Sequence, residues 1–142
     1  MKKRWIGGLA GLVLAFILAG CGATGQVESL SPEEMKEYME QNDSAYILIN
    51  STEDQKERKE NINLVKESIE SINVKEINFL SEEMLNQDLN KEDVGLSNIV
   101  LEALIYYKNG EINDYVSLSN SDYSSNEDKR ENVQKFIDET SS

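Results

Sequence analysis

The 142-residue chain contains no histidine, one cysteine and one proline. The single cysteine, Cys21, lies near the N-terminus, so residues 22–142 contain no thiol. Zinc, copper and haem sites depend on His and Cys ligands, and such a site is therefore not expected here. The chain also lacks the Asp-x-Asp/Asn-x-Asp/Asn-Gly spacing of an EF-hand calcium loop. The sequence therefore predicts a protein without a bound metal or cofactor.

Positive charge is also scarce. The chain has 14 Lys and Arg residues and 27 Asp and Glu residues, for a net charge of −13. Three of the basic residues lie at positions 2–4, and without them 11 basic residues face 27 acidic ones, for a net charge of −16. Such a surface repels nucleic acid and anionic lipid headgroups. The negative charge is interpreted as a means of keeping the protein soluble. The alternative is that it binds a cationic partner, such as a basic peptide or metal ions at the cell surface.

The N-terminus has the three parts of an export signal. Residues 2–4 (Lys-Lys-Arg) are basic, residues 5–18 are apolar, and Ala19 and Gly20 supply small side chains before a cleavage site. The apolar run of about 14 residues is shorter than the roughly 20 that a membrane-spanning helix needs. An uncleaved anchor and a plain signal peptide are the alternatives, but no stop-transfer pattern follows.

The residues Leu18-Ala19-Gly20-Cys21 resemble the lipobox of bacterial lipoproteins. The resemblance implies cleavage before Cys21, which would then carry acyl chains on its sulfur and its amine. Two or more acyl chains hold a protein stably on a membrane. We therefore expect a signal peptide at residues 1–20 and a lipid-anchored protein on the extracytoplasmic face of the bacterial cell membrane. Residues 21–30 are then the lipidated cysteine and a short flexible tether, and residues 31–142 form one domain.

The domain begins with clear signals for a helix and a strand. Ser31, Pro32 and Glu34 form a helix start with a capping box, which predicts a helix over 32–41. Residues 45–49 (Ala-Tyr-Ile-Leu-Ile) are a continuous apolar run, typical of a central strand that is buried on both faces.

A second helix is predicted from a cap at Ser51 or Thr52 to about residue 71. Its charged first turns, residues 53–60, are expected to project into solvent. Its apolar residues recur at spacings of three and four, which predicts one buried face; they are Ile62, Val65, Ile69 and Ile72.

The remaining chain predicts three strands and two helices. Asn109-Gly110 is a strong hairpin signal because both residues tolerate positive φ. The other expected elements are a strand at 74–79, a short helix capped by Ser81, a strand within 99–107, an edge strand at 112–118 and a final helix capped by Ser125 or Asn126.

A βαβ unit followed by a β-hairpin and a closing helix is a restricted topology. This order resembles the thioredoxin fold, and residues 103–112 (Ala-Leu-Ile-Tyr-Tyr-Lys-Asn-Gly-Glu-Ile) look like the penultimate hairpin of thioredoxins. The resemblance covers residues 31–139. It implies an α/β, thioredoxin-like fold with a single mixed sheet of about four strands flanked by helices.

The sequence departs from the thioredoxin pattern at the residues that carry out thiol–disulfide exchange. Thioredoxins carry Cys-x-x-Cys at the start of the helix after the central strand, where the helix dipole lowers a thiol pKa. The corresponding residues 51–58 (Ser-Thr-Glu-Asp-Gln-Lys-Glu-Arg) contain no sulfur. The position of the family's cis-proline falls at or near Glu102, and the only proline is Pro32, so a trans bond is expected there. Disulfide exchange by this domain is therefore excluded on chemical grounds.

Two classes of function remain open. The first is a redox-inactive binding or accessory module. It would bind an extended segment by strand addition, and that segment would belong to a secreted peptide or to a membrane-protein partner. Its groove would be formed by Ser51, Thr52, Glu53, Asp54, Gln55, Leu101 and Glu102. Glu102 is the one charge in an apolar run, and it is either a solvent-facing residue at a strand start or a recognition carboxylate.

The second class is an enzyme of unrelated chemistry, or a diverged relative of thiol-disulfide oxidoreductases. A serine nucleophile would have no histidine as its base, so the hydroxyls of Ser51 and Thr52 are expected to cap a helix. A self-protection or exclusion lipoprotein is a third hypothesis, which the sequence does not test.

Overall fold

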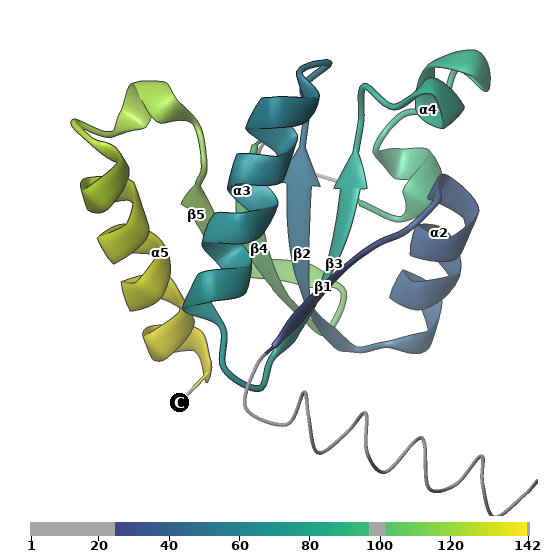
Figure 1. Cartoon of the computed structure of the whole chain (residues 1–142). Coiled ribbons are helices and arrows are strands. Elements are labelled where there is room, and N and C mark those ends of the chain that lie inside the picture. The colour runs from purple at the N-terminus through teal and green to yellow at the C-terminus, as the bar shows by residue number, and fades with distance from the viewer. Residues whose placement is uncertain (1–24, 97–101, 142) are drawn as a thin grey trace, which may run out of the picture.

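The computed structural model of the chain describes residues 25–96 and 102–141. These residues form one five-stranded mixed sheet, in the order β1-β3-β2-β4-β5, with helices on both faces (Figure 1). The predicted α/β class with a single mixed sheet is confirmed. The predicted number of about four strands is wrong, because the sheet has a fifth strand at its edge.

The fifth strand is β1 (Gln26–Ser29), which pairs in parallel with β3 (Asn73–Asn78). Its register places Gln26 opposite Asn73 and Ser29 opposite Glu76. The prediction of a flexible tether is therefore wrong for residues 26–29. The segment Gln-Val-Glu-Ser carries one apolar residue because a short edge strand buries little, and only Val27 packs on an apolar cluster.

The next two elements agree with the sequence. Helix α2 (Pro32–Gln41) begins with the predicted capping box: the Glu34 N–H donates to Ser31 Oγ (3.2 Å), and the Ser31 N–H donates to Glu34 Oε1 (3.0 Å). Strand β2 (Ser44–Asn50) lies between β3 and β4, as expected for a central strand.

Helix α3 (Gln55–Ser68) starts later and ends earlier than predicted. Its N-cap is Asp54, whose side chain accepts a hydrogen bond from the Lys56 N–H (2.9 Å). The hydroxyl of Thr52 instead accepts from the Asp54 N–H (3.0 Å). This local side-chain turn competes with helical bonding and delays the helix.

The second half of the chain completes the sheet. Asn109 (φ 57°) and Gly110 (φ 78°) form the predicted hairpin turn between β4 and β5. Residues 99–101 of the predicted strand over 99–107 lie outside the described residues. Besides β3, the elements are α4 (Glu82–Asn86) capped by Ser81, η1 (Glu92–Val94), β4 (Ala103–Lys108), β5 (Glu111–Ser117), η2 (Asn120–Asp122) and α5 (Asn126–Ser141).

The core consists of two apolar clusters, one on each face of the sheet. Along β2, Ile47 and Ile49 belong to the cluster that includes Met35 of α2 and Met84 of α4. Leu48, between them, points to the opposite cluster, under α3 and α5. This alternation follows from the two-residue period of a strand, and it explains why the whole run at 45–49 is apolar.

Candidate functional site

The predicted groove residues meet at one end of the sheet. Ser51–Gln55 follow the carboxyl end of β2, and Glu102 directly precedes β4. Because Ile49 of β2 pairs with Ala103 of β4, Glu102 lies beside the end of β2. Leu101 lies outside the described residues. We call the surface formed by Ser51–Gln55 and Glu102 the groove end.

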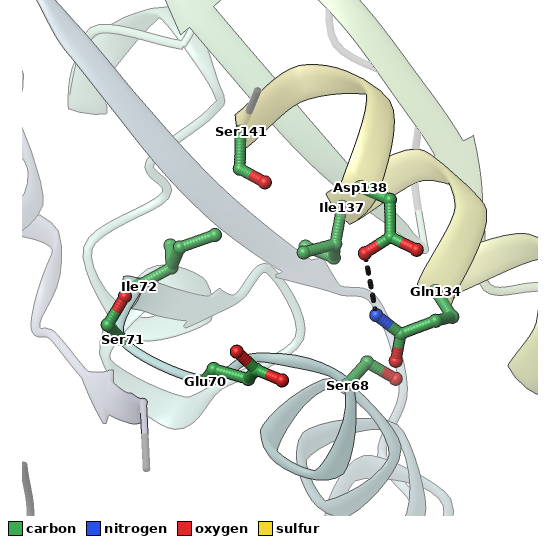
Figure 2. Close-up of a pocket in the computed structure, with 8 residues that line it drawn as sticks. All are labelled: Ser68, Glu70, Ser71, Ile72, Gln134, Ile137, Asp138 and Ser141. Atoms are coloured by element: carbon green, nitrogen blue, oxygen red, sulfur yellow. Dashed lines mark hydrogen bonds between the residues drawn. The ribbon is translucent and has the colours of Figure 1, made fainter. Parts of the chain in front are cut away.

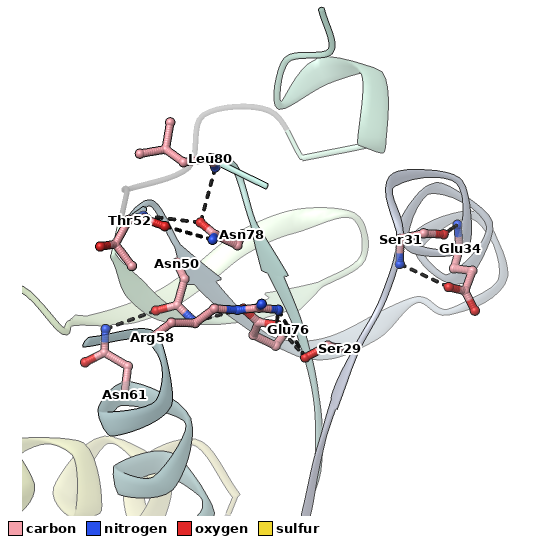
Figure 3. A network of polar contacts seen from close by, with 10 residues as sticks. All are labelled: Ser29, Ser31, Glu34, Asn50, Thr52, Arg58, Asn61, Glu76, Asn78 and Leu80. Atoms are coloured by element: carbon pink, nitrogen blue, oxygen red, sulfur yellow. Dashed lines mark hydrogen bonds and ion pairs between the residues drawn. The ribbon is translucent and has the colours of Figure 1, made fainter. Parts of the chain in front are cut away.

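Thr52 anchors the groove end and is 7% exposed. Its N–H donates to Asn78 Oδ1 (3.2 Å), and Asn78 Nδ2 donates back to the Thr52 carbonyl oxygen (2.9 Å) (Figure 3). This reciprocal pair joins the segment after β2 to the end of β3. The exposed residues of the segment are Glu53, Asp54 and Gln55, and Ser51 is half-buried. The accessible part of this segment is thus largely acidic.

Glu102 has an unusual backbone conformation. Its φ is 53°, in the left-handed region, and its carbonyl oxygen accepts a hydrogen bond from the Leu118 N–H (2.7 Å). The other described non-glycine residues with positive φ are Asp88 and Asn109, types that tolerate this region far better than glutamate. A non-glycine residue held there costs of order 1–3 kcal/mol, and such strain concentrates at functional sites.

The side chain of Glu102 is half-buried and lies among other charges. Burial raises the pKa of its carboxyl, the charge of Glu57 raises it further, and the charge of Lys129 lowers it. The carboxyl is therefore near α3 and α5. It is neither fully solvated nor paired within a described salt bridge.

Replacing Glu102 with glycine is expected to raise the free energy of unfolding by about 1 kcal/mol, because glycine adopts positive φ without steric cost. Urea unfolding followed by circular dichroism measures this change. Glu111→Gly is the matched control at the start of β5, where the loss of a side chain in a strand should lower stability by about 0.5–1 kcal/mol. A Glu102→Gly protein that is less stable than wild type would contradict the assignment of strain.

Sequence reasoning missed a buried polar network on the α3 side of the sheet. Its centre is Glu76 of β3, which is 0% exposed. Its Oε1 accepts from Ser29 Oγ (2.6 Å) and Arg58 Nη2 (2.6 Å), and its Oε2 accepts from Arg58 Nε (2.9 Å) and Asn50 Nδ2 (2.9 Å) (Figure 3). Burial alone would raise the pKa of Glu76, but these hydrogen bonds and the charge of Arg58 hold it below its usual value.

Arg58 also corrects an expectation from the sequence. The charged first turns of α3 were expected to project into solvent, but Arg58 folds back onto the sheet and ties α3 to β3 and β1. The sequence gives one weak signal for the Arg58–Glu76 pair. A single glutamate lies within the strand segment Val-Lys-Glu-Ile, and a basic residue lies on the preceding helix.

The network continues to α5. Asn50 Oδ1 accepts from Asn61 Nδ2 (3.0 Å), and Asn61 Oδ1 accepts from Lys129 Nζ (2.9 Å). Lys129 is 5% exposed and also donates to Asn120 Oδ1 (3.1 Å). Burial lowers the pKa of Lys129, while the charges of nearby glutamates, Glu102 among them, raise it. Each member has partners within the fold, so the network holds the scaffold under the groove end.

Other features of the described residues bear on function. Across residues 25–96 and 102–141, no three His, Cys, Asp or Glu side chains gather where they could hold a metal ion. In the same part of the chain, no helix is long and apolar enough to cross a membrane.

Comparisons of the sequence with protein-family models and with curated proteins found no match.

Proposed function

We propose that the protein is a lipid-anchored, redox-inactive domain of thioredoxin-like topology that binds an extracytoplasmic peptide or membrane-protein partner. The observation that carries the binding role is the strained, half-buried Glu102. It lies beside the end of β2, and the exposed acidic residues Glu53 and Asp54 follow that strand. The anchor is Cys21, on the strength of its lipobox-like context, and residues 22–142 supply no thiol for disulfide exchange.

The sheet topology supports the thioredoxin-like part of the proposal. Strands β2 and β3 are parallel and joined by α3, while β4 and β5 are antiparallel and are followed by α5. This is the βαβ unit, hairpin and closing helix on which the resemblance rests. The turn at Asn109-Gly110 is the hairpin that carries the most specific local likeness.

The charge of the groove end indicates the class of partner. Glu53, Asp54 and Glu102 are acidic, and the whole chain has a net charge of −13. A cationic segment of a peptide or protein therefore gains both attraction over long range and local pairing. Strands β2 and β4 are paired on both sides, so recognition in this proposal uses side-chain carboxylates at the end of the sheet instead of strand addition along β2 or β4.

The enzyme alternative would need titratable groups with shifted pKa values gathered in one site. Glu102 and Lys129 have shifted pKa values of this kind and influence each other. The Lys129 ammonium, however, is buried and donates to Asn61 and Asn120. This arrangement favours a structural role for the lysine, and the binding function is therefore preferred.

Glu102→Lys is expected to reduce capture of the partner about tenfold, because a reversed charge at the groove end repels a cationic segment. The measurement uses the purified domain as bait against extracts of the native cell surface, with quantitative mass spectrometry. A lysine-rich synthetic peptide in titration calorimetry serves as a defined probe of the same surface.

The matched control is Glu111→Lys, which introduces the same charge change at an exposed position in β5. It should leave capture close to wild type. Equal losses for the two variants would show that only net charge matters, and unchanged capture by Glu102→Lys would contradict the proposed role of the groove end.

A further inference from the structure

Gly25 lies buried against the turn between α3 and β3. A β-carbon at this position would come within 2.4 Å of the Ile72 carbonyl oxygen and 2.6 Å of Ile69 Cγ1. Atoms do not approach so closely, so the backbone fits against this turn only because glycine has no side chain. Strand β1 begins at the next residue. The chain is therefore held in the fold from Gly25 onwards.

The surface around Gly25 is one end of the domain. It includes the turn after α3, residues 68–72, and the last turns of α5, residues 134–141, which together line a pocket of about 250 Å³ (Figure 2). We call this surface, with Gly25 itself, the Gly25 end. In Figure 1 it lies at the bottom, where β1 starts and α5 finishes.

The groove end lies at the opposite end of the sheet. Strands β1, β2 and β3 are parallel, so their amino ends lie together near Gly25 and the carboxyl ends of β2 and β3 lie together near Ser51–Gln55. Helix α3 runs back between the two ends. Its 14 residues correspond to a separation of about 21 Å.

The link between Cys21 and the folded domain is short. Only residues 22–24 separate Cys21 from Gly25. Even a fully extended chain covers at most about 15 Å over these four peptide units. An anchor at Cys21 therefore keeps the Gly25 end within about 15 Å of the bilayer. The groove end lies about 21 Å further along α3, and the short link does not hold it at the bilayer.

We propose that the Gly25 end faces the lipid headgroup layer and that the groove end is presented away from the bilayer. This inference rests on the lipid anchor of the proposed function and adds the orientation of the domain. The occupant of the Gly25 end is the headgroup layer of the membrane to which the domain is anchored. A partner that uses the groove end therefore approaches from the side away from the membrane.

In this proposal the short link, and not attraction to lipid, holds the Gly25 end at the bilayer. The pocket lining contains Glu70 and Asp138 and no basic residue. Such a surface does not attract anionic headgroups. A longer link should therefore free the domain from the bilayer surface.

Single-cysteine variants test the orientation, because an acylated Cys21 leaves no other thiol in the protein. Ser71→Cys marks the Gly25 end and Glu53→Cys marks the groove end, and both positions are exposed in the fold. The lipidated full-length mature protein is placed in phosphatidylcholine vesicles and treated with a maleimide that carries a long polyethylene glycol chain. The thiol of Ser71→Cys should react several-fold more slowly in the anchored protein than in the unanchored domain. The thiol of Glu53→Cys should react at the same rate in the anchored protein and in the unanchored domain.

A spacer gives the decisive comparison. Insertion of about 12 Gly and Ser residues between Thr24 and Gly25 adds on the order of 20 Å of reach and should restore the rate at Ser71→Cys. Equal reactivity of the two positions in protein that floats with the vesicles would overturn the orientation while leaving the anchor intact. Protein that carries no acyl chain by mass spectrometry and does not float would overturn the anchor and, with it, the orientation.

Discussion

Arg58→Met is expected to lower the free energy of unfolding by about 3 kcal/mol, because it leaves the carboxylate of Glu76 buried without its cation. The side chain of Glu76 is 0% exposed and that of Arg58 is 25% exposed. Methionine keeps most of the apolar stem of arginine. The variant therefore removes the charge, the two hydrogen bonds to Glu76 and the one to Ser29. Urea unfolding at neutral pH measures the change.

Lys59→Met is the matched control, since it removes the same charge one residue further along α3 at an exposed position. Its effect should stay within about 0.5 kcal/mol, as is usual for surface positions. Equal effects of Arg58→Met and Lys59→Met would contradict the buried pair.

The pH dependence of the same variant provides a second readout. In the wild type the pKa of Glu76 is lowered on folding. Its contribution to stability is therefore present above the unfolded pKa, about 4.3, and is lost as the pH falls through the lower pKa of the folded state. In Arg58→Met the buried carboxyl gains from protonation. The difference in stability between the two proteins should thus shrink as the pH falls from about 7 towards 4.

Cys21→Ser is expected to release the protein from the membrane, because serine cannot take the thioether-linked lipid. With each buried methylene of an acyl chain contributing about 0.8 kcal/mol, loss of the chains removes the proposed attachment altogether. The net charge of the chain is negative, so its surface does not attract anionic headgroups. Cell fractionation and labelling with a radioactive fatty acid measure the change.

Ala23→Ser is the control for this experiment. It introduces the same residue type two positions later and should leave both the label and the membrane fraction unchanged. A Cys21→Ser protein that still incorporates fatty acid and stays with the membrane would contradict lipidation at this residue.

Local sequence signals predicted the elements whose stabilising contacts are local. The capping box of Ser31 and Glu34 joins residues three apart, and the hairpin at Asn109-Gly110 depends on the φ preferences of two adjacent residues. The central position of β2 also followed from its apolar run, because burial on both faces leaves no position for a polar side chain.

The wrong predictions concern elements that depend on contacts between residues far apart in the sequence. Strand β1 has little apolar content, and its four residues do not indicate that it pairs with β3, 47 positions later. Helix α3 begins later than predicted because Thr52 forms hydrogen bonds with Asn78 and with the Asp54 N–H. The left-handed conformation of Glu102 is likewise invisible in the sequence, since glutamate seldom adopts it.

The α/β class and the absence of a thiol in residues 22–142 can be predicted from the sequence alone, because each depends on residue type or on spacing along the chain. Which charges are buried, and which surfaces lie at opposite ends of the sheet, depends on contacts between distant segments and becomes visible in the folded chain. Glu76 and Arg58 are 18 residues apart and look like ordinary surface charges until the sheet brings them together. The distance between Gly25 and the groove end likewise follows from parallel strand pairing, which is a property of the folded chain and not of any one segment.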